Sequence, residues 1–186
     1  QRKSLKHLMV DRQFMNALII ANGPLPPRSV VRKLAASSGI IVCADGGANR
    51  ARALHVSPDI ILGDLDSITS STRKYFANIP VLRIGDQYST DLEKAITFCL
   101  RLSITTANIV GALGERIDHA TGSLGCFKKF RNDINLCFYD GHGMLTLVDK
   151  QLSIRTKRGQ QLSLIPLERC TGITTRHLRY NLKNDT

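Results

Sequence analysis

Short apolar runs alternate with amphipathic stretches of helical spacing along most of this chain, and this alternation restricts its fold more than any other feature. Each apolar run has the length of a buried strand. The expected strands are residues 17–21, 40–44, 59–62, 80–84, 108–112 and 134–139. The expected helices are residues 28–37, 48–54, 70–77, 91–102 and 116–130. This order predicts a largely parallel sheet with helices on both faces, which is a three-layer αβα domain.

The clearest helix signal begins at Thr90. Thr90 and Glu93 have the T-x-x-E spacing of a capping box, in which two side chains satisfy backbone N–H groups at the start of a helix. An apolar stripe at helical spacing follows, made of Leu92, Ala95, Ile96, Cys99 and Leu100.

The pattern changes after Tyr139, where a turn is followed by closely spaced, β-rich segments at residues 144–148, 152–155, 161–166 and 172–175. We therefore expect a basic N-terminal tail (residues 1–13), an α/β catalytic domain (14–140) and a smaller all-β, sandwich-like domain (141–186). The last of these is small for independent stability, so it should pack on the first domain or on another subunit.

Composition narrows the possible partners. The chain has 26 Lys and Arg against 15 Asp and Glu, a formal net charge of +11, but the basic residues are dispersed and aromatic residues are few. This distribution argues against nucleic-acid binding as the main role, and a basic surface suits anionic nucleotides equally well. No apolar run approaches the roughly 20 residues of a membrane span. The cysteines form no metal-binding or disulfide pattern, and a reducing cytoplasm is the expected location.

Acidic residues and glycines follow four consecutive expected strands. In an open parallel sheet, ligands bind beyond the carboxyl ends of the strands, so these residues should meet at one edge. The acids at this edge are Asp45, Asp64, Asp66, Asp86, Asp91, Glu115 and Asp118. Their mutual repulsion would be costly in the absence of a bound cation.

Asp64 and Asp66 could share one ion, with Asp91 nearby, because Mg²⁺ usually takes one or two carboxylates together with waters and phosphate oxygens. Each acid also has a structural interpretation. Asp is common in turns, which would explain the D-x-D pair, and an acid in the first turn of a helix complements the helix dipole, which would explain Asp91.

Other residues near this edge could bind phosphate. Gly46 and Gly47 would let a phosphate approach the backbone at the start of a helix, although glycine also serves tight turns. Lys94 and Arg116 could reach phosphates bound over the acids, or could lie on solvated helix faces. The chain has no Walker A, protein-kinase or G-x-S-x-G motif. The residues alone therefore indicate a Mg²⁺-dependent enzyme that acts on a phosphorylated substrate.

At these positions the chain resembles the thiamine pyrophosphokinase family. The matching segments are residues 43–50 (CADGGANR), 63–67 (GDLDS), 86–87 (DQ), 90–94 (TDLEK) and 111–119 (GALGERIDH). The resemblance implies an α/β domain, a β-sandwich domain and a homodimer whose active sites lie between subunits. Two features differ from the family: the chain ends at Thr186, so the second domain is expected to lack its C-terminal strands, and Glu115 stands where glycine is usual.

The resemblance also implies that Asp64, Asp66 and Asp91 hold Mg²⁺ with ATP, that Arg116 and Lys94 contact phosphates, and that Gln87 lies near thiamine. Tyr180 is a further candidate for thiamine. The expected catalytic residues are Asp64, Asp66, Asp91, Arg116 and Asp118. The expected cofactor-binding residues are Asp45, Gly46, Gly47, Asn49, Ser67, Gln87, Thr90 and Lys94.

The implied reaction is transfer of the pyrophosphoryl group of ATP to the thiamine hydroxyl, giving thiamine diphosphate and AMP. Positioning and charge stabilisation dominate such transfers. Asp118 or Asp91 could accept the hydroxyl proton. The alternatives are a Mg²⁺-dependent nucleotide pyrophosphatase and a non-catalytic nucleotide-binding module.

Overall fold

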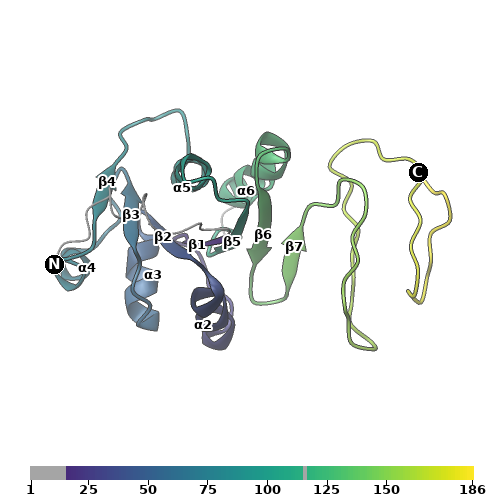
Figure 1. Cartoon of the computed structure of the whole chain (residues 1–186), viewed down its shortest axis with the longest axis horizontal. Coiled ribbons are helices and arrows are strands. Elements are labelled where there is room, and N and C mark those ends of the chain that lie inside the picture. The colour runs from purple at the N-terminus through teal and green to yellow at the C-terminus, as the bar shows by residue number, and fades with distance from the viewer. Residues whose placement is uncertain (1–15, 115–116) are drawn as a thin grey trace. The chain divides into compact units, whose positions relative to one another are not determined.

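The computed structural model describes residues 16–114 and 117–186 (Figure 1), and the chain divides into two compact units, residues 1–149 and 150–186. The strands of the first unit are β1 (Asn16–Ile20), β2 (Ile40–Ala44), β3 (Ile60–Gly63), β4 (Val81–Arg83), β5 (Thr106–Val110), β6 (Asn135–Tyr139) and β7 (Met144–Thr146). The helices are α2 (Arg28–Ser37), α3 (Gly47–Leu54), α4 (Ser70–Tyr75), α5 (Asp91–Arg101) and α6 (Ile117–Phe130). Among the described residues, no helix combines the length and the apolar character that crossing a bilayer requires.

The strands form one 7-stranded sheet in the order β4-β3-β2-β1-β5-β6-β7. All neighbouring pairs are parallel except β6 and β7, which are antiparallel. Helices α5 and α6 lie on one face of the sheet, and α2, α3 and α4 lie on the other (Figure 1). The expected three-layer α/β architecture is therefore confirmed.

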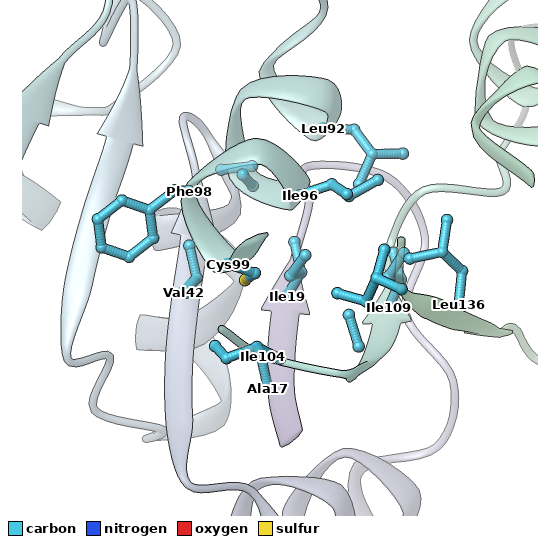
Figure 2. Packing of buried hydrophobic residues seen from close by; sticks show 14 of the residues in the cluster. Ala17, Ile19, Val42, Leu92, Ile96, Phe98, Cys99, Ile104, Ile109 and Leu136 are labelled. Atoms are coloured by element: carbon cyan, nitrogen blue, oxygen red, sulfur yellow. The ribbon is translucent and has the colours of Figure 1, made fainter. Parts of the chain in front are cut away.

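The central strand β1 shows why its sequence is a continuous apolar run. Ala17 and Ile19 belong to the core on the α5 side, whereas Leu18 and Ile20 belong to the core on the α3 side, and all four are fully buried. A strand that is covered on both faces needs apolar residues at every position. Figure 2 shows α5, with Ile96 and Cys99, over the strand that carries Ile19, and all three residues belong to one buried cluster.

Helix α5 begins with the expected capping box. The Thr90 hydroxyl accepts a hydrogen bond from the backbone N–H of Glu93 at 3.2 Å, and Glu93 Oε2 accepts one from the backbone N–H of Thr90 at 2.9 Å. The predicted stripe faces the sheet, because Leu92, Ala95, Ile96 and Cys99 are buried in the core. These contacts fix the first turn of α5, which carries Asp91.

The second unit starts later than residue 141. Met144 pairs with Tyr139, so β7 extends the first sheet, and the turn between them is held by Asp140 Oδ1, which accepts the backbone N–H groups of His142 and Gly143. The turn residues that indicated a domain boundary instead make a tight hairpin. The first unit consequently runs to Asp149.

Residues 150–186 are drawn as extended chain without a helix in Figure 1. Within this range, which is fully described, the single β pairing is an isolated antiparallel bridge between Ile173 and Asp185. The backbone N–H of Thr175 also donates to the carbonyl of Leu182 at 3.1 Å. The expected segments 152–155 and 161–166 have no ladder, because an apolar pattern predicts an extended backbone but does not supply its partner strand.

Candidate active site

Three aspartates from separate segments meet at the carboxyl edge of the sheet. Asp45 follows β2, Asp64 follows β3 and Asp91 opens α5, and one carboxylate oxygen of each lies within 4.8 Å of the others. The register explains the meeting, since Ala44 pairs with Leu62 and the backbone N–H of Asp45 donates to the carbonyl of Leu62 at 2.7 Å. We call Asp45, Asp64 and Asp91 the acidic trio.

Asp45 is the most constrained member of the trio. It is only 5% exposed, its φ is 43°, and its Oδ1 atom accepts no hydrogen bond from any described residue. A buried carboxylate oxygen without a partner is costly, and native proteins usually satisfy it with a donor, a water or an ion. A divalent cation between the three carboxylates would satisfy this oxygen.

Lys94 is bound to the trio. Its Nζ atom donates to Asp91 Oδ1 at 3.0 Å, and its side chain is almost fully buried. Burial raises the pKa of the Asp91 carboxyl above its ordinary value, and the charges of Asp64 and Asp45 act in the same direction, although the hydrogen bond from Lys94 opposes them. One ammonium does not balance three carboxylates, so the cluster has an excess of negative charge suited to a cation.

Gly63 makes room for the trio. Its φ is 139°, and a Cβ atom at this position would lie 3.0 Å from both Asp45 Cβ and Asp91 Oδ1. Any larger residue would therefore push apart two members of the trio. The donor set, the unpartnered oxygen of Asp45 and this glycine-lined space all fit a small divalent cation bound by oxygen ligands.

Asp66, the third expected Mg²⁺ ligand, lies outside the trio. Between the two acids, Leu65 has a φ of 70° and turns into the core, and Asp66 is exposed and accepts a hydrogen bond from the Ser67 hydroxyl at 2.9 Å. The left-handed residue changes the direction of the chain, so two aspartates in a D-x-D sequence need not point the same way. The structure thus brings Asp64 and Asp91 together with Asp45.

The loop before α5 is shaped by Asp86. Its carboxylate accepts hydrogen bonds from the Ser89 hydroxyl and from the backbone N–H of Tyr88, and these bonds hold the pKa of Asp86 below its ordinary value. Gln87 and Tyr88 in this loop are exposed to solvent. Gln87 is therefore accessible to a substrate, and it does not belong to the trio.

Two expected catalytic residues lie at or before α6. Asp118 is in the first turn of this helix, is exposed, and lies 4.0 Å from Nε2 of His119. Arg116, like Glu115, is outside the described residues. Asp118 does not join the acidic trio.

The two glycines at the start of α3 have a packing role. A Cβ atom on Gly47 would lie 1.9 Å from the Ile20 carbonyl oxygen, and one on Gly46 would lie 2.3 Å from Asn22 Nδ2. Both glycines let α3 pack closely against the end of β1. This explains the pair without a phosphate, and their contact with a nucleotide stays a prediction.

Sequence reasoning missed two parts of the site. Asp45 was expected near the nucleotide and not as a carboxylate facing Asp64 and Asp91, and no role was expected for Gly63. Both could have been found from one signal: Asp45 and Gly63 directly follow the expected strands 40–44 and 59–62, and the carboxyl ends of parallel strands meet at one edge of the sheet.

Two models of one family match the chain. "Thiamin pyrophosphokinase, catalytic domain" matches residues 31–138, and "Thiamin pyrophosphokinase, vitamin B1 binding domain" matches residues 149–186. The acidic trio lies within the first match. The second match begins at the last residue of the first compact unit.

Curated relatives carry the same name. Thiamine pyrophosphokinase 1 of Oryza sativa subsp. japonica is 29% identical over 204 residues, which cover 94% of this chain and 76% of the relative. Thiamine pyrophosphokinase 1 of Arabidopsis thaliana is 28% identical, with coverage of 90% of this chain and 73% of the relative.

Solved structures of this kind share the fold. Thiamin pyrophosphokinase from Candida albicans aligns with a TM-score of 0.60 and 22% identity over 70% of this chain, and thiamine pyrophosphokinase from Bacillus subtilis aligns with a TM-score of 0.58 and 24% identity over 67%. The chain spans 59% and 60% of these two solved chains, which is less than two thirds of either.

Proposed function

This chain belongs to the thiamine pyrophosphokinase family, and on that premise we propose that it transfers the pyrophosphoryl group of ATP to the hydroxyl of thiamine. The products are thiamine diphosphate and AMP. The observation that carries the proposal is the acidic trio, in which a buried oxygen of Asp45 lacks a partner within the described part of the chain. A site built this way suits a metal-bound polyphosphate.

Mg²⁺ is the proposed metal, and Asp45, Asp64 and Asp91 are its proposed ligands. When bound, Mg²⁺ would neutralise charge on the phosphate oxygens of ATP. Asp66 is a proposed additional ligand, because it is exposed one residue beyond Leu65 in the same loop. The remaining coordination positions would be filled by water and by the nucleotide.

Lys94 and Arg116 are the proposed phosphate contacts. Lys94 is held by Asp91 at 3.0 Å, so its charge is fixed beside the trio. An ammonium that is already in place stabilises charge on the transferred group without reorganising during the reaction. Arg116 stays a proposal based on the family resemblance.

Asp118 is the proposed acceptor of the hydroxyl proton. Asp91 is the other candidate, but its carboxylate is committed to Lys94 and to the trio. Burial raises the pKa of Asp91, but a cation bound to its oxygens would oppose protonation and so reduce its capacity to accept a proton. Asp118 is exposed to solvent in the first turn of α6 and lies outside the trio.

We propose a homodimer with active sites at the subunit interface, and residues 150–186 as the thiamine-binding part. The support is the match of this segment to the vitamin B1 binding domain and the exposure of several of its apolar side chains. Gln87 and Tyr180 are the proposed thiamine contacts, and both are exposed. A cytoplasmic location is also proposed, and the free state of all five cysteines supports it.

The test is incubation of the full chain with ATP and Mg²⁺, with and without thiamine, followed by chromatography of the nucleotides. The proposal expects AMP and thiamine diphosphate in equal amounts, only when thiamine and Mg²⁺ are both present, and loss of both products in Asp91→Asn. ADP as the main product would refute pyrophosphoryl transfer. AMP formed without thiamine would indicate a nucleotide pyrophosphatase, and ATP binding without turnover would indicate a non-catalytic module.

A further inference from the structure

Asn49 connects helix α3 to the chain segment that carries Asp64 and Asp66. Its Nδ2 atom donates to the carbonyl oxygen of Ser67 at 2.8 Å. Its Oδ1 atom accepts from the backbone N–H of Thr69 at 3.2 Å and from the Thr69 hydroxyl at 3.1 Å. Both polar atoms of this amide are therefore engaged by residues 67–69, directly after Asp66.

The same loop is anchored on its apolar side by other residues. Leu65 and Ile68 are buried in the core cluster that includes Ala48 of α3. The Arg73 guanidinium donates to the carbonyl oxygen of Leu65. Residues 64–69 are thus held by the buried side chains of Leu65 and Ile68 and by the hydrogen bonds of Asn49. Asp64 and Asp66 belong to this anchored loop.

Thr69 extends this connection to helix α4. Its hydroxyl is the N-cap of α4 and accepts from the backbone N–H of Thr72 at 3.3 Å. A single hydroxyl therefore joins the cap of α4 to the amide of Asn49. The direction in which the loop leaves Asp66 is set jointly by α3 and α4.

We infer that Asn49 is a positioning residue that holds residues 64–69 in the arrangement needed to bind the metal. The inference rests on the proposed metal site and assigns Asn49 a role through the loop, in place of direct contact with the nucleotide. The site needs a side chain of this length with one donor and one acceptor. Partners of this kind behind a metal ligand orient it, and their loss weakens metal affinity.

A matched control lies at the opposite, amino edge of the sheet. Asn16 makes the same type of connection: its Nδ2 atom donates to the carbonyl of Ser37 at 2.9 Å, and its Oδ1 atom accepts from the backbone N–H of Gly39 at 2.9 Å. Asn16→Ala removes a comparable pair of hydrogen bonds at a place that does not hold the acids. It measures the cost of losing such a connection alone.

The experiment is titration of the full chain with Mn²⁺, following free Mn²⁺ by electron paramagnetic resonance, in wild type, Asn49→Ala, Asn49→Leu and Asn16→Ala. Leu matches the shape of Asn and favours helix, so Asn49→Leu limits any loss of folding. Circular dichroism checks that each variant is folded without metal. We expect both Asn49 variants to raise the Kd for Mn²⁺ by about tenfold or more. We expect Asn16→Ala to stay within about twofold of wild type, because distant sites act independently.

Several outcomes would overturn the inference. A Kd for Mn²⁺ in the Asn49 variants that matches wild type, or one that Asn16→Ala weakens equally, removes the positioning role while leaving the metal site intact. Failure of both Asn49 variants to fold makes Asn49 a structural residue. A wild-type protein that binds no Mn²⁺, or whose binding survives Asp64→Asn, refutes the proposed metal site itself and the positioning role with it.

Discussion

The Asp45 side chain is in an unfavourable state without a cation. It is buried, it lies close to two other carboxylates, and its Oδ1 atom has no hydrogen-bond donor among the described residues. Its backbone is in the left-handed region, where Asp and Asn are tolerated better than most residues. Folding stability is therefore reduced at this residue in a way that metal binding would reverse.

We predict that Asp45→Asn raises the free energy of unfolding without metal by about 1 kcal/mol, because it removes the repulsion between the buried Asp45 carboxylate and its two neighbours. The same change should abolish the stabilisation that added Mg²⁺ gives to wild type. Chemical denaturation with and without Mg²⁺ measures both quantities. Asp59→Asn is the control, since Asp59 Oδ2 accepts the backbone N–H of Ile41 at 2.9 Å near the start of β3, outside the trio. A destabilised Asp45→Asn that still responds to Mg²⁺ would contradict the prediction.

The cysteines are expected to differ in reactivity according to burial. Burial raises the pKa of Cys43 well above its usual value, raises the pKa of Cys99 to about 12, and, assisted by the charge of Glu93, raises the pKa of Cys126 to about 11. The thiolate is the reactive form, so we predict that a thiol reagent at neutral pH leaves these three unmodified in the native protein and modifies them after unfolding. Mass spectrometry after timed labelling tests this. Rapid native labelling of Cys43 would show that the sheet opens far more readily than its burial implies.

The sequence predicted that aspartates form the site, but not which aspartates lie close together. Asp64 and Asp91 were expected at the metal and do face each other across the sheet edge. Asp45 stands beside these two acids and Asp66 does not, because the left-handed Leu65 changes the direction of the chain between the two acids of the D-x-D sequence. The role of Asp66 as a metal ligand stays a prediction. A local sequence pattern does not reveal such a backbone angle, whereas strand register does bring residues after neighbouring strands together.

The bounds of helices and strands were predicted best where the apolar pattern of the sequence matches the faces that are buried in the fold. The expected bounds of α2 and β2 are those observed, and both elements are apolar on the faces that they bury. Strand β5 begins and ends two residues earlier than expected, at Thr106 and Val110. Gly111 ends it, with a φ of 72° and a hypothetical Cβ only 2.4 Å from the Ala21 carbonyl oxygen. That close contact is tertiary, so the apolar run alone could not reveal it.

The start of helix α5 is held by more than its own cap. Glu93 accepts a hydrogen bond from Lys129 of α6 at 2.6 Å through Oε1 while its Oε2 atom completes the capping box with Thr90. Burial acts to raise the pKa of Glu93, but these hydrogen bonds outweigh it and the pKa lies below its ordinary value. One side chain thus links the helix that carries Asp91 to the helix that carries Asp118.

We predict that Thr90→Ala lowers the free energy of unfolding by about 1 kcal/mol, because an uncapped N–H group remains at the start of α5. Thr90→Ser should restore most of the loss, since serine caps as well as threonine does. Glu93→Gln should keep the capping box and weaken the link to Lys129, with a loss below about 1 kcal/mol. Urea denaturation measures all three. If Thr90→Ser were as unstable as Thr90→Ala, the hydroxyl would not be the stabilising group.

At the scale of the whole molecule, residues 150–186 include several large apolar side chains that are exposed to solvent. Those between residues 152 and 167 are Leu152, Ile154, Leu162, Leu164, Ile165 and Leu167. Ile165 has the largest exposure of these six, at 63%. Large exposed apolar patches mark interaction surfaces in soluble proteins. This exposure supports the proposed dimer, in which a second copy would cover these side chains.

We predict that the protein sediments as a dimer at micromolar concentration and that Ile165→Asp shifts it toward the monomer, because a charge at the interface must lose its water. Analytical ultracentrifugation over a concentration series measures the shift. Tyr75→Asp is a suitable control, since Tyr75 is an exposed apolar side chain of the first unit. A wild-type monomer with full activity would exclude an active site shared between subunits.

A shared active site makes a stronger prediction than dimerisation. If the acidic trio of one subunit works with the thiamine-binding segment of the other, then Asp64→Asn and Tyr180→Ala damage different halves of each site. Each variant alone should lose most of its activity, and mixing them under conditions that allow subunit exchange should restore it. With random exchange, half the dimers are mixed and each has one intact site, so recovery should reach about a quarter of wild-type activity. A mixture of Asp64→Asn with Asp91→Asn should recover nothing, because both changes fall in the same half. No recovery in the first mixture despite demonstrated exchange would place each complete site within a single subunit. Recovery in the control would contradict the grouping of Asp64 and Asp91 in the trio of one subunit.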